Sequence, residues 1–205
     1  MQDRKKMLEE NRNKFENISK ATGKIFSKAG FSPNSYTLAS LVFALFCFYF
    51  LLKNNLVFAV CFFSIAIIMD FIDGAVARFM QKESKEGAFL DTICDRYVEG
   101  IALLGFIFLP LPYFFLGNSL WIFLSIFGGL MTTYVKAAAK EKGLIDEEMK
   151  KGLLGRPERT ILIFLAMVLG IFNISWLIYP IVILAVFSNL TAIQRINLAL
   201  RPDKK

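Results

Sequence analysis

Long apolar segments are the feature that most limits the folds open to this chain. They lie near residues 37–52, 56–80, 88–110, 120–139 and 160–190 and are rich in Phe, Leu, Ile and Val. A helix needs about 20 such residues to cross a bilayer. Hydrophobic residues make up 56% of the chain and Phe occurs 22 times, which excludes a disordered chain, a disulfide scaffold and an ordinary soluble domain. The sequence therefore predicts an all-α integral membrane protein.

The last apolar segment decides the number of membrane helices. It is interrupted only by Asn173-Ile174-Ser175, so it forms either one kinked helix or two helices joined by a tight turn. With two helices, all Lys and Arg except Lys53 and Arg96 fall on one side of the membrane. Because basic residues collect on the cytoplasmic side, we expect six transmembrane helices in the cell membrane, with both termini in the cytoplasm.

The first 30 residues differ in composition from the rest of the chain. Basic residues alternate there with apolar ones at helical spacing, as in helices that lie on an anionic lipid surface. We expect a helix from about Asp3 to Ala29, ended by Gly30. A soluble juxtamembrane helix is the alternative, because the apolar stripe is thin. The prediction is an amphipathic juxtamembrane helix over residues 1–30, with no cleavable signal peptide, followed by a six-helix domain over residues 31–205.

Cysteine and histidine contribute little to the chemistry open to this chain. Cys47, Cys61 and Cys94 have no CxxC spacing, so neither disulfides nor a zinc site are indicated. Histidine is absent. Proton transfer near neutral pH must therefore use carboxylates, Lys, Tyr or bound water.

Four aspartates, Asp70, Asp73, Asp91 and Asp95, interrupt the second and third apolar segments. Charged residues are costly in a membrane helix and usually mark a functional site. The members of each pair share a helix face, and a polar turn near Lys82 lies midway between the pairs. An antiparallel hairpin would bring the four carboxylates together, where they repel unless a cation separates them. Hard cations prefer oxygen ligands, so we expect one or two Mg²⁺ or Mn²⁺ ions.

Three other interpretations of these aspartates remain. Structural ion pairs with Arg78 and Arg96 are disfavoured because two arginines cannot neutralise four aspartates. An ion or proton transporter would need polar steps across the membrane, but the outer halves of the helices are almost wholly apolar. A non-catalytic scaffold would not need the carboxylates. A site open only to the cytoplasmic face favours an enzyme.

A longer pattern surrounds the aspartates. Asp70-Phe-Ile-Asp73-Gly74-Ala-Val-Ala77-Arg78 is followed by Gly87, Asp91 and Asp95. Every specified position of the pattern DxxDGxxARx₈GxxxDxxxD is matched, so the chain resembles the CDP-alcohol phosphatidyltransferase family. The expected six helices and N-terminal amphipathic helix resemble that family over almost the whole chain.

This resemblance implies transfer of a phosphatidyl-type group from a CDP-linked lipid to an alcohol, with release of CMP. Asp70, Asp73 and Asp91 would bind a first Mg²⁺ or Mn²⁺ ion. Asp70, Asp91 and Asp95 would bind a second, and Asp95 would also act as general base. The residues implied to hold the CDP-lipid are Pro33, Asn34, Ser35, Tyr36, Thr37, Asp73, Gly74, Arg78 and Ser84. Of these, Asn34 and Ser35 lie near the start of a helix, where Asn or Ser is often only a cap.

The segments Gly155–Arg159 and Thr191–Arg195 resemble those of phosphatidylinositol phosphate and archaetidylinositol phosphate synthases. In these relatives a Lys and two Arg hold the phosphate of the inositol phosphate acceptor. By position they are Lys136, Arg159 and Arg195, with Arg156 as an additional candidate, although basic residues here also serve as topological anchors. The hypothesis is transfer to myo-inositol 1-phosphate. Glycerol 3-phosphate as acceptor, and CDP-inositol with inositol phosphate, are the alternatives.

The resemblance also implies a homodimer that forms through membrane helices. Gly128 and Gly129 would permit close helix contact, either between subunits or within one. The expected partners are the CDP-linked lipid, the inositol phosphate and membrane lipids, not nucleic acid. Diacylglycerol and archaeol tails would both fit the apolar segments.

Overall fold

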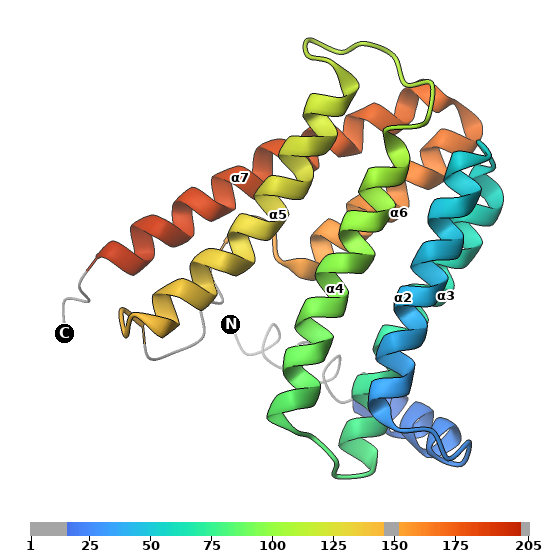
Figure 1. Cartoon of the computed structure of the whole chain (residues 1–205), viewed down its shortest axis with the longest axis vertical. Helices are drawn as coiled ribbons and strands as arrows, with labels where there is room; N and C mark the ends of the chain where they lie inside the picture. Colours follow the sequence, from blue (N-terminus) through green and yellow to red (C-terminus); the bar gives the residue numbers. More distant parts are fainter. Residues whose placement is uncertain (1–15, 146–151, 202–205) are drawn as a thin grey trace, which may run out of the picture. The chain divides into compact units, whose positions relative to one another are not determined.

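Helices make up nearly all the regular structure in residues 16–145 and 152–201, the part of the chain that the computed structural model describes. An isolated β-bridge joins Phe114 and Leu116, and no strand is found in these residues, which confirms the all-α prediction. A helical segment at residues 16–27 comes first. The helices that follow (Figure 1) are α2 (Pro33–Leu52), α3 (Leu56–Phe79), α4 (Lys85–Phe106), α5 (Asn118–Glu141), α6 (Arg156–Phe172), the short 3₁₀ helix η1 (Ile174–Leu177) and α7 (Ile178–Leu200).

Four stretches of the described chain are long and apolar enough to cross a membrane. They are α2, α3, α5 and the combined Ile174–Leu200 stretch. Helix α4 has 22 residues but carries several charged side chains, and α6 has only 17 residues. The multi-pass character expected from the sequence is therefore supported, while the count of six spans stays a prediction.

The last apolar segment is divided into two helices, as the charge distribution indicated. Helix α6 ends at Phe172, and the Asn173 side chain accepts a hydrogen bond of 2.9 Å from the backbone N–H of Ser175. This bond caps η1, which leads directly into α7. A short polar side chain that competes for backbone hydrogen bonds is thus the physical cause of the break.

The chain is divided into two compact units. The first unit comprises residues 1–43 and 64–95, and the second comprises residues 44–63 and 96–205. Helices α2, α3 and α4 therefore each contribute residues to both units. All four membrane aspartates fall in the first unit, because they lie between residues 64 and 95.

In the first unit, the helical segment 16–27 packs against α3. The buried side chains of Tyr36, Ile72 and Val76 form a small core, and Phe26 of the segment packs against it. The Tyr36 hydroxyl donates a hydrogen bond of 2.9 Å to the backbone carbonyl of Phe26. The segment ends at residue 27, and Gly30 adopts a φ of +75°, a conformation that glycine tolerates best. The part of the predicted helix before residue 16 lies outside the described residues.

In the second unit, α5 and α7 pack closely. The Ser125 hydroxyl donates to the Ile181 carbonyl over 3.2 Å, and the Asn189 amide donates to the Leu124 carbonyl over 2.9 Å. A Cβ on Gly128 would lie 2.6 Å from Asn189 Nδ2, and one on Gly129 would lie 2.8 Å from Glu99 Oε1. Both glycines therefore serve close packing within one subunit.

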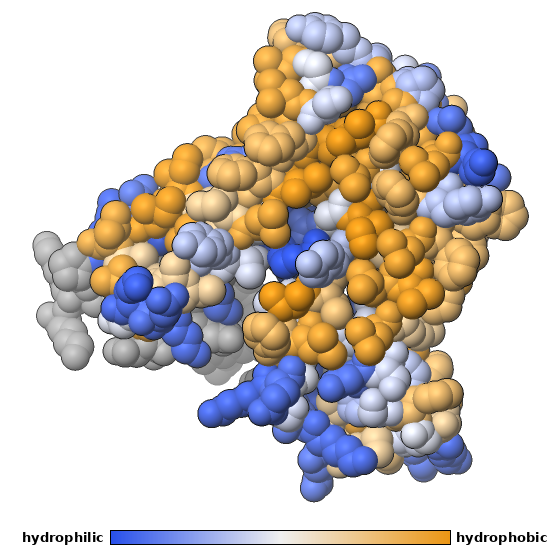
Figure 2. Space-filling view, in the orientation of Figure 1, coloured by the Kyte–Doolittle hydropathy of each residue, from blue (hydrophilic) through white to orange (hydrophobic). Residues whose placement is uncertain are grey.

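Apolar side chains also cover much of the protein surface. On the face seen in Figure 2, a large part of the visible surface is hydrophobic. Along α2 the side chains of Leu38, Leu45 and Tyr49 are each about half exposed (50%, 52% and 51%). Such exposure would be unfavourable in water but matches helices whose outer faces contact lipid.

Candidate active site

The hairpin of α3 and α4 brings three of the four membrane aspartates together. Asp70 on α3 and Asp91 and Asp95 on α4 each offer a carboxylate oxygen, and these oxygens lie within 4.8 Å of one another. All three residues are half-buried. Three converging carboxylates form a donor set that suits a hard divalent cation such as Mg²⁺ or Mn²⁺.

Asp73 is not part of this triad but lies deeper in the same unit. It is 6% exposed, and its Oδ2 accepts a hydrogen bond of 2.6 Å from the hydroxyl of Thr37, which is 4% exposed. Asp73 lies three residues after Asp70 on the same helix, so the two carboxylates occupy neighbouring positions on one face. The bond to Thr37 ties the start of α2 to the carboxylate-bearing face of α3.

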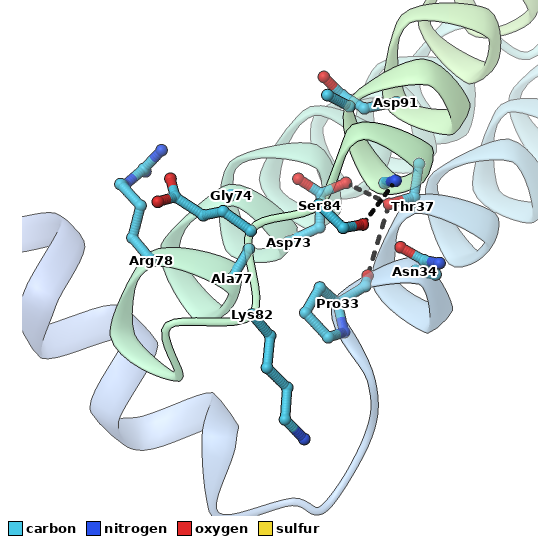
Figure 3. A pocket seen from close by; sticks show the side chains of 13 residues that line it. Pro33, Asn34, Thr37, Asp73, Gly74, Ala77, Arg78, Lys82, Ser84 and Asp91 are labelled. Carbon is cyan, nitrogen blue, oxygen red and sulfur yellow. Dashed lines mark hydrogen bonds between the residues drawn. The ribbon is translucent and has the colours of Figure 1, made fainter.

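A pocket of about 170 Å³ opens beside these carboxylates. Figure 3 shows that its lining side chains come from the start of α2, the end of α3, the connecting turn and the start of α4. The residues that line the pocket are Pro33, Asn34, Thr37, Asp73, Gly74, Ala77, Arg78, Lys82, Glu83, Ser84, Gly87, Ala88 and Asp91.

Most of the residues predicted to hold the CDP-lipid line this pocket, but Ser35 and Tyr36 do not. The Ser35 hydroxyl lies 2.9 Å from the Ser32 hydroxyl, as expected near a helix start. Tyr36 is 7% exposed and belongs to the small core of the first unit. The structure therefore gives both side chains a local structural partner.

The start of α4 is shaped to approach the pocket closely. Ser84 caps this helix, because its hydroxyl accepts a hydrogen bond of 3.0 Å from the backbone N–H of Gly87. A Cβ at position 87 would lie 3.2 Å from the Ser84 hydroxyl and 3.4 Å from Asn34 Oδ1. Glycine at this position therefore leaves room for the polar groups of Ser84 and Asn34 beside the helix.

Arg78 extends from the last turn of α3 into the lining of the pocket. Its Nε and Nη2 donate hydrogen bonds of 3.3 Å and 2.9 Å to the hydroxyl of Ser19, which lies in the helical segment 16–27. A Cβ on Gly74 would lie 3.3 Å from Arg78 Nη1. The guanidinium thus lies against the backbone of α3, and a side chain at position 74 would displace it by a few tenths of an ångström.

The basic residues predicted to bind the acceptor belong to the second unit, and two of them meet at Thr132. Arg159 is 2% exposed, and it donates to Glu99 Oε1 over 2.9 Å and to the Thr132 hydroxyl over 2.7 Å. Arg195 donates to the Thr132 carbonyl over 2.7 Å. Glu99 also pairs with Arg96, with 2.5 Å between Nη1 and Oε2. Arg159 is therefore held by internal partners.

The two remaining basic candidates lie at helix positions near this cluster in sequence. Lys136 follows Thr132 by four residues on α5, so the two residues share a helix face. Arg156 is the first residue of α6, three residues before Arg159. The proposed acceptor residues thus come from three helices of the second unit, whereas the carboxylates and the pocket belong to the first.

Sequence reasoning missed several residues of these two sites. Lys82 and Glu83 line the pocket, and their position in the polar turn was the available signal. Glu99 is a further charged residue in an apolar segment, four residues after Asp95. Its signal is therefore the same as that of the aspartates, since a charge is costly in a membrane helix and usually marks a functional site. Ser19 gave no signal, because a single serine in a basic helix is unremarkable in the sequence.

Comparison with known proteins gives consistent matches. Residues 31–191 match the family model described as CDP-alcohol phosphatidyltransferase. The chain is 29% identical over 193 residues to an archaetidylinositol phosphate synthase of Pyrococcus horikoshii, covering 93% of this chain and 95% of the relative. It is 30% identical to an archaetidylinositol phosphate synthase of Aeropyrum pernix over 178 residues, covering 87% and 88% of the two chains.

Solved structures share the fold. The phosphatidylinositol phosphate synthase of Mycobacterium tuberculosis with CDP-DAG bound superposes with a TM-score of 0.78 at 22% identity, covering 92% of this chain and 96% of that one. The same protein in complex with manganese and citrate gives a TM-score of 0.74 at 24% identity, covering 91% and 90%.

Proposed function

Because this chain belongs to the CDP-alcohol phosphatidyltransferase family and is a CDP-alcohol phosphotransferase, we propose that its acceptor is myo-inositol 1-phosphate. The group transferred from the CDP-lipid is diacylglycerol phosphate or archaeol phosphate, and CMP is released. The observation that carries the proposed chemistry is the carboxylate triad of Asp70, Asp91 and Asp95 on the same hairpin as the pocket. The archaetidylinositol phosphate synthases of Pyrococcus horikoshii and Aeropyrum pernix, which are among its relatives, support the choice of acceptor.

The donor would bind in the pocket of the first unit. Pro33, Asn34 and Thr37 line its α2 side, and Gly74 and Arg78 line its α3 side. Arg78 would pair with the diphosphate, because a guanidinium fork matches two phosphate oxygens. The backbone N–H groups at the start of α4, next to Ser84, add a partial positive charge that favours an anion there.

The aspartates would hold two divalent cations, with Asp70, Asp73 and Asp91 at the first and Asp70, Asp91 and Asp95 at the second. The triad geometry supports the second set, and the manganese complex of the structural relative supports the class of ion. When bound, these ions would neutralise the diphosphate and stabilise the charge on the departing CMP. The chain's own contribution is to fix the carboxylates, as Thr37 does for Asp73.

Asp95 would act as general base. The acceptor hydroxyl oxygen forms a bond to the lipid-linked phosphorus, and the bond from that phosphorus to the bridging diphosphate oxygen breaks. CMP leaves with that electron pair, and the hydroxyl proton passes to the Asp95 carboxylate. A carboxylate is one of the bases open to this chain, which has no histidine.

The acceptor phosphate would be bound by Lys136, Arg159 and Arg195, with Arg156 as a further candidate. Two of these residues converge on Thr132, which supports a common binding region on the second unit. The buried Glu99 balances part of the positive charge without cancelling it. Arginine pairs suit a dianionic phosphate ester.

We further propose six membrane spans, a cytoplasmic active site and a homodimer. Helices α4 and α6 would complete the set of spans by crossing with their charged residues directed into the protein. The domain division at residue 30 and the lipid-surface position of the N-terminal helix belong to the same proposal. Ile18 and Ile25 are 58% and 65% exposed, which supports contact with lipid.

The test is CMP release by the purified protein in detergent with Mg²⁺. CDP-diacylglycerol or CDP-archaeol would be combined with inositol 1-phosphate, glycerol 3-phosphate or free inositol, one acceptor at a time. Release only with inositol 1-phosphate, lost in Asp95→Asn, is the expected result. Release with glycerol 3-phosphate instead would keep the chemistry and overturn the acceptor.

Two further arms separate the remaining alternatives. CDP-inositol with inositol phosphate, without any CDP-lipid, tests the related headgroup-joining reaction. Metal flux in sealed vesicles tests a divalent-cation transporter. Turnover of CDP-inositol with inositol phosphate would replace the proposed function with the headgroup-joining reaction. Metal flux into the vesicles, together with no CMP release, would replace it with transport.

A further inference from the structure

The helical segment 16–27 reaches the donor pocket through one side chain. Ser19 is 5% exposed, and its hydroxyl accepts hydrogen bonds from Arg78 Nε at 3.3 Å and Nη2 at 2.9 Å. The two residues are 59 positions apart in the sequence. Arg78 lines the pocket, as Figure 3 shows, whereas Ser19 is not among the residues that line it. Ser19 therefore contacts a pocket residue without lining the pocket itself.

The position of Ser19 is fixed by the packing of its helix. Ser19, Gly23 and Phe26 lie on one face of the segment. A Cβ on Gly23 would collide with the Ala75 carbonyl and lie 2.6 Å from the Cβ of Phe79. The backbones of the segment and of α3 are thus in contact one turn from Ser19.

The other end of the segment is fixed too. The Phe26 ring meets the Tyr36 ring edge to face, with 6.0 Å between centroids, and the Phe26 carbonyl accepts a hydrogen bond from the Tyr36 hydroxyl. Contacts at Gly23 and Phe26 leave the segment little freedom to slide along α3. The Ser19 hydroxyl is therefore presented to Arg78 by a docked helix.

The hydrogen bonds to Ser19 determine which edge of the guanidinium is directed toward a ligand. An arginine has five N–H donors in a planar fork. Ser19 engages the edge formed by Nε and Nη2, while Nη1 lies over Gly74, a residue of the pocket lining. Because a long, flexible side chain loses much conformational freedom when a ligand orders it, an arginine ordered in advance binds its ligand more tightly.

We infer that Ser19 is a positioning residue for donor binding, which holds the Arg78 guanidinium in the orientation that meets the diphosphate of a CDP-linked substrate. The inference rests on the proposed function, because it takes the pocket as the CDP site. Ser19 touches neither the substrate nor the reacting atoms. Its effect is on the affinity of the pocket for the CDP moiety.

The experiment compares Ser19→Ala with Ser27→Ala in the full-length protein. Ser27 lies in the same helical segment, but its hydroxyl bonds the Lys24 carbonyl of its own helix over 3.1 Å, so it is a matched control. We expect Ser19→Ala to raise the KM for the CDP-lipid by about 3- to 10-fold, less than the full loss of a hydrogen bond to a charged group, because Arg78 itself remains and loses only its ordering contact. The acceptor KM and kcat should stay within about twofold, and Ser27→Ala should match the wild type.

A second measurement does not depend on turnover. The dissociation constant for CDP, from calorimetric titration in detergent with Mg²⁺, should rise by the same factor in Ser19→Ala. In an Arg78→Ala background, the Ser19→Ala change should have no further effect on CDP affinity, because its partner is gone. Additive losses in this double-mutant cycle, an unchanged CDP affinity, or equal rises in donor and acceptor KM would each overturn the inference.

Thermal unfolding of the same variants separates positioning from packing. A lower melting temperature for Ser19→Ala than for Ser27→Ala, together with increases in both the donor KM and the acceptor KM, would assign Ser19 to helix docking instead. The proposed function fails separately. Wild-type protein that binds CDP but releases no CMP would overturn only the function, and wild-type protein that does not bind CDP would overturn both.

Discussion

The two polar regions of this protein are built in opposite ways. In the first unit, Asp70, Asp91 and Asp95 converge on one helical hairpin, and Asp91 also lines a pocket that a ligand can enter. In the second unit, Arg159 is 2% exposed and already bound by Glu99 and Thr132. In the first region like charges repel one another, and the proposed cation would relieve that repulsion. In the second region the buried arginine is already compensated by a carboxylate, and the proposed anion would have to share that arginine.

This difference teaches that charge alone does not identify the catalytic side of a membrane enzyme. Like charges held together cost stability, and such groups cluster at functional sites, where a bound ion can compensate for them. Removing one partner of a buried pair of opposite charges leaves the other charge uncompensated, which destabilises the fold. Substitutions in the first region should therefore affect chemistry more than folding, and substitutions in the second should affect both.

The largest expected effect is on chemistry in the first unit. Asp95→Asn keeps the side-chain volume but removes the proposed base, so CMP release should fall by about a thousandfold. CDP affinity and the melting temperature should change little, since three carboxylates remain nearby. A variant that unfolds at a much lower temperature than the wild type would break the contrast between the two regions.

The next largest effect is on stability in the second unit. Glu99→Gln leaves the buried Arg159 without its carboxylate partner, and removal of one partner of a buried ion pair costs about 3 kcal/mol or more. The free energy of unfolding in detergent measures this loss. Glu141→Gln is the matched control: its partner Lys142 and Glu141 itself are 71% and 72% exposed, so the change should be below about 1 kcal/mol. Equal effects of the two substitutions would contradict the prediction.

Arg195→Ala sharpens the comparison within the second unit. The Arg195 guanidinium donates to a backbone carbonyl rather than to a buried carboxylate. The loss of Arg195 should therefore weaken acceptor binding more than it destabilises the fold. We expect the acceptor KM to rise by about 10- to 100-fold, as for loss of one charged contact to a phosphate. The donor KM provides the internal reference. An unchanged acceptor KM would remove Arg195 from the proposed pocket.

The smallest expected effect concerns the hydrogen bond between Thr37 and Asp73. Thr37→Val keeps the shape of the side chain but removes the donor, which lies 2.6 Å from Asp73 Oδ2. Loss of one hydrogen bond to a charged group should raise the half-saturating Mg²⁺ concentration by about tenfold. Thr92→Val, whose hydroxyl bonds the Ala88 carbonyl of its own helix over 2.9 Å, is the control. Equal half-saturating Mg²⁺ concentrations in the two variants would argue against a role for the Thr37–Asp73 hydrogen bond in metal binding.

The sequence predicted the first region better than the second because local geometry determines most of it. The aspartates lie on two helices joined by a short turn, so helical periodicity and one antiparallel connection bring them together. The break at Asn173 followed from charge distribution and local polarity in the same way. By contrast, the pairing of Glu99 with Arg159 joins residues 60 positions apart, and no local rule determines how their helices rotate.

Tyr36 and Ser19 show what local sequence patterns do not reveal even inside the first region. The family resemblance places Tyr36 among the residues that hold the CDP-lipid, and the structure adds that its ring is buried and that its hydroxyl donates a hydrogen bond to the Phe26 carbonyl. Ser19 was overlooked because its role depends on the docking of a separate helix. Both contacts depend on tertiary packing at the Phe26 and Gly23 face, which the composition of the N-terminal segment does not encode.

Thr132 contacts the two arginines of the second unit through different groups, so a mutation at this position affects them differently. Its hydroxyl donates to the Gly129 carbonyl and accepts from Arg159, while its backbone carbonyl accepts from Arg195. A change of side chain at this position can release Arg159 but leaves the carbonyl that holds Arg195 in place. Random substitution at position 132 would therefore affect the contact with Arg159 without removing the one with Arg195, and serine, which keeps the hydroxyl, is the replacement expected to retain both.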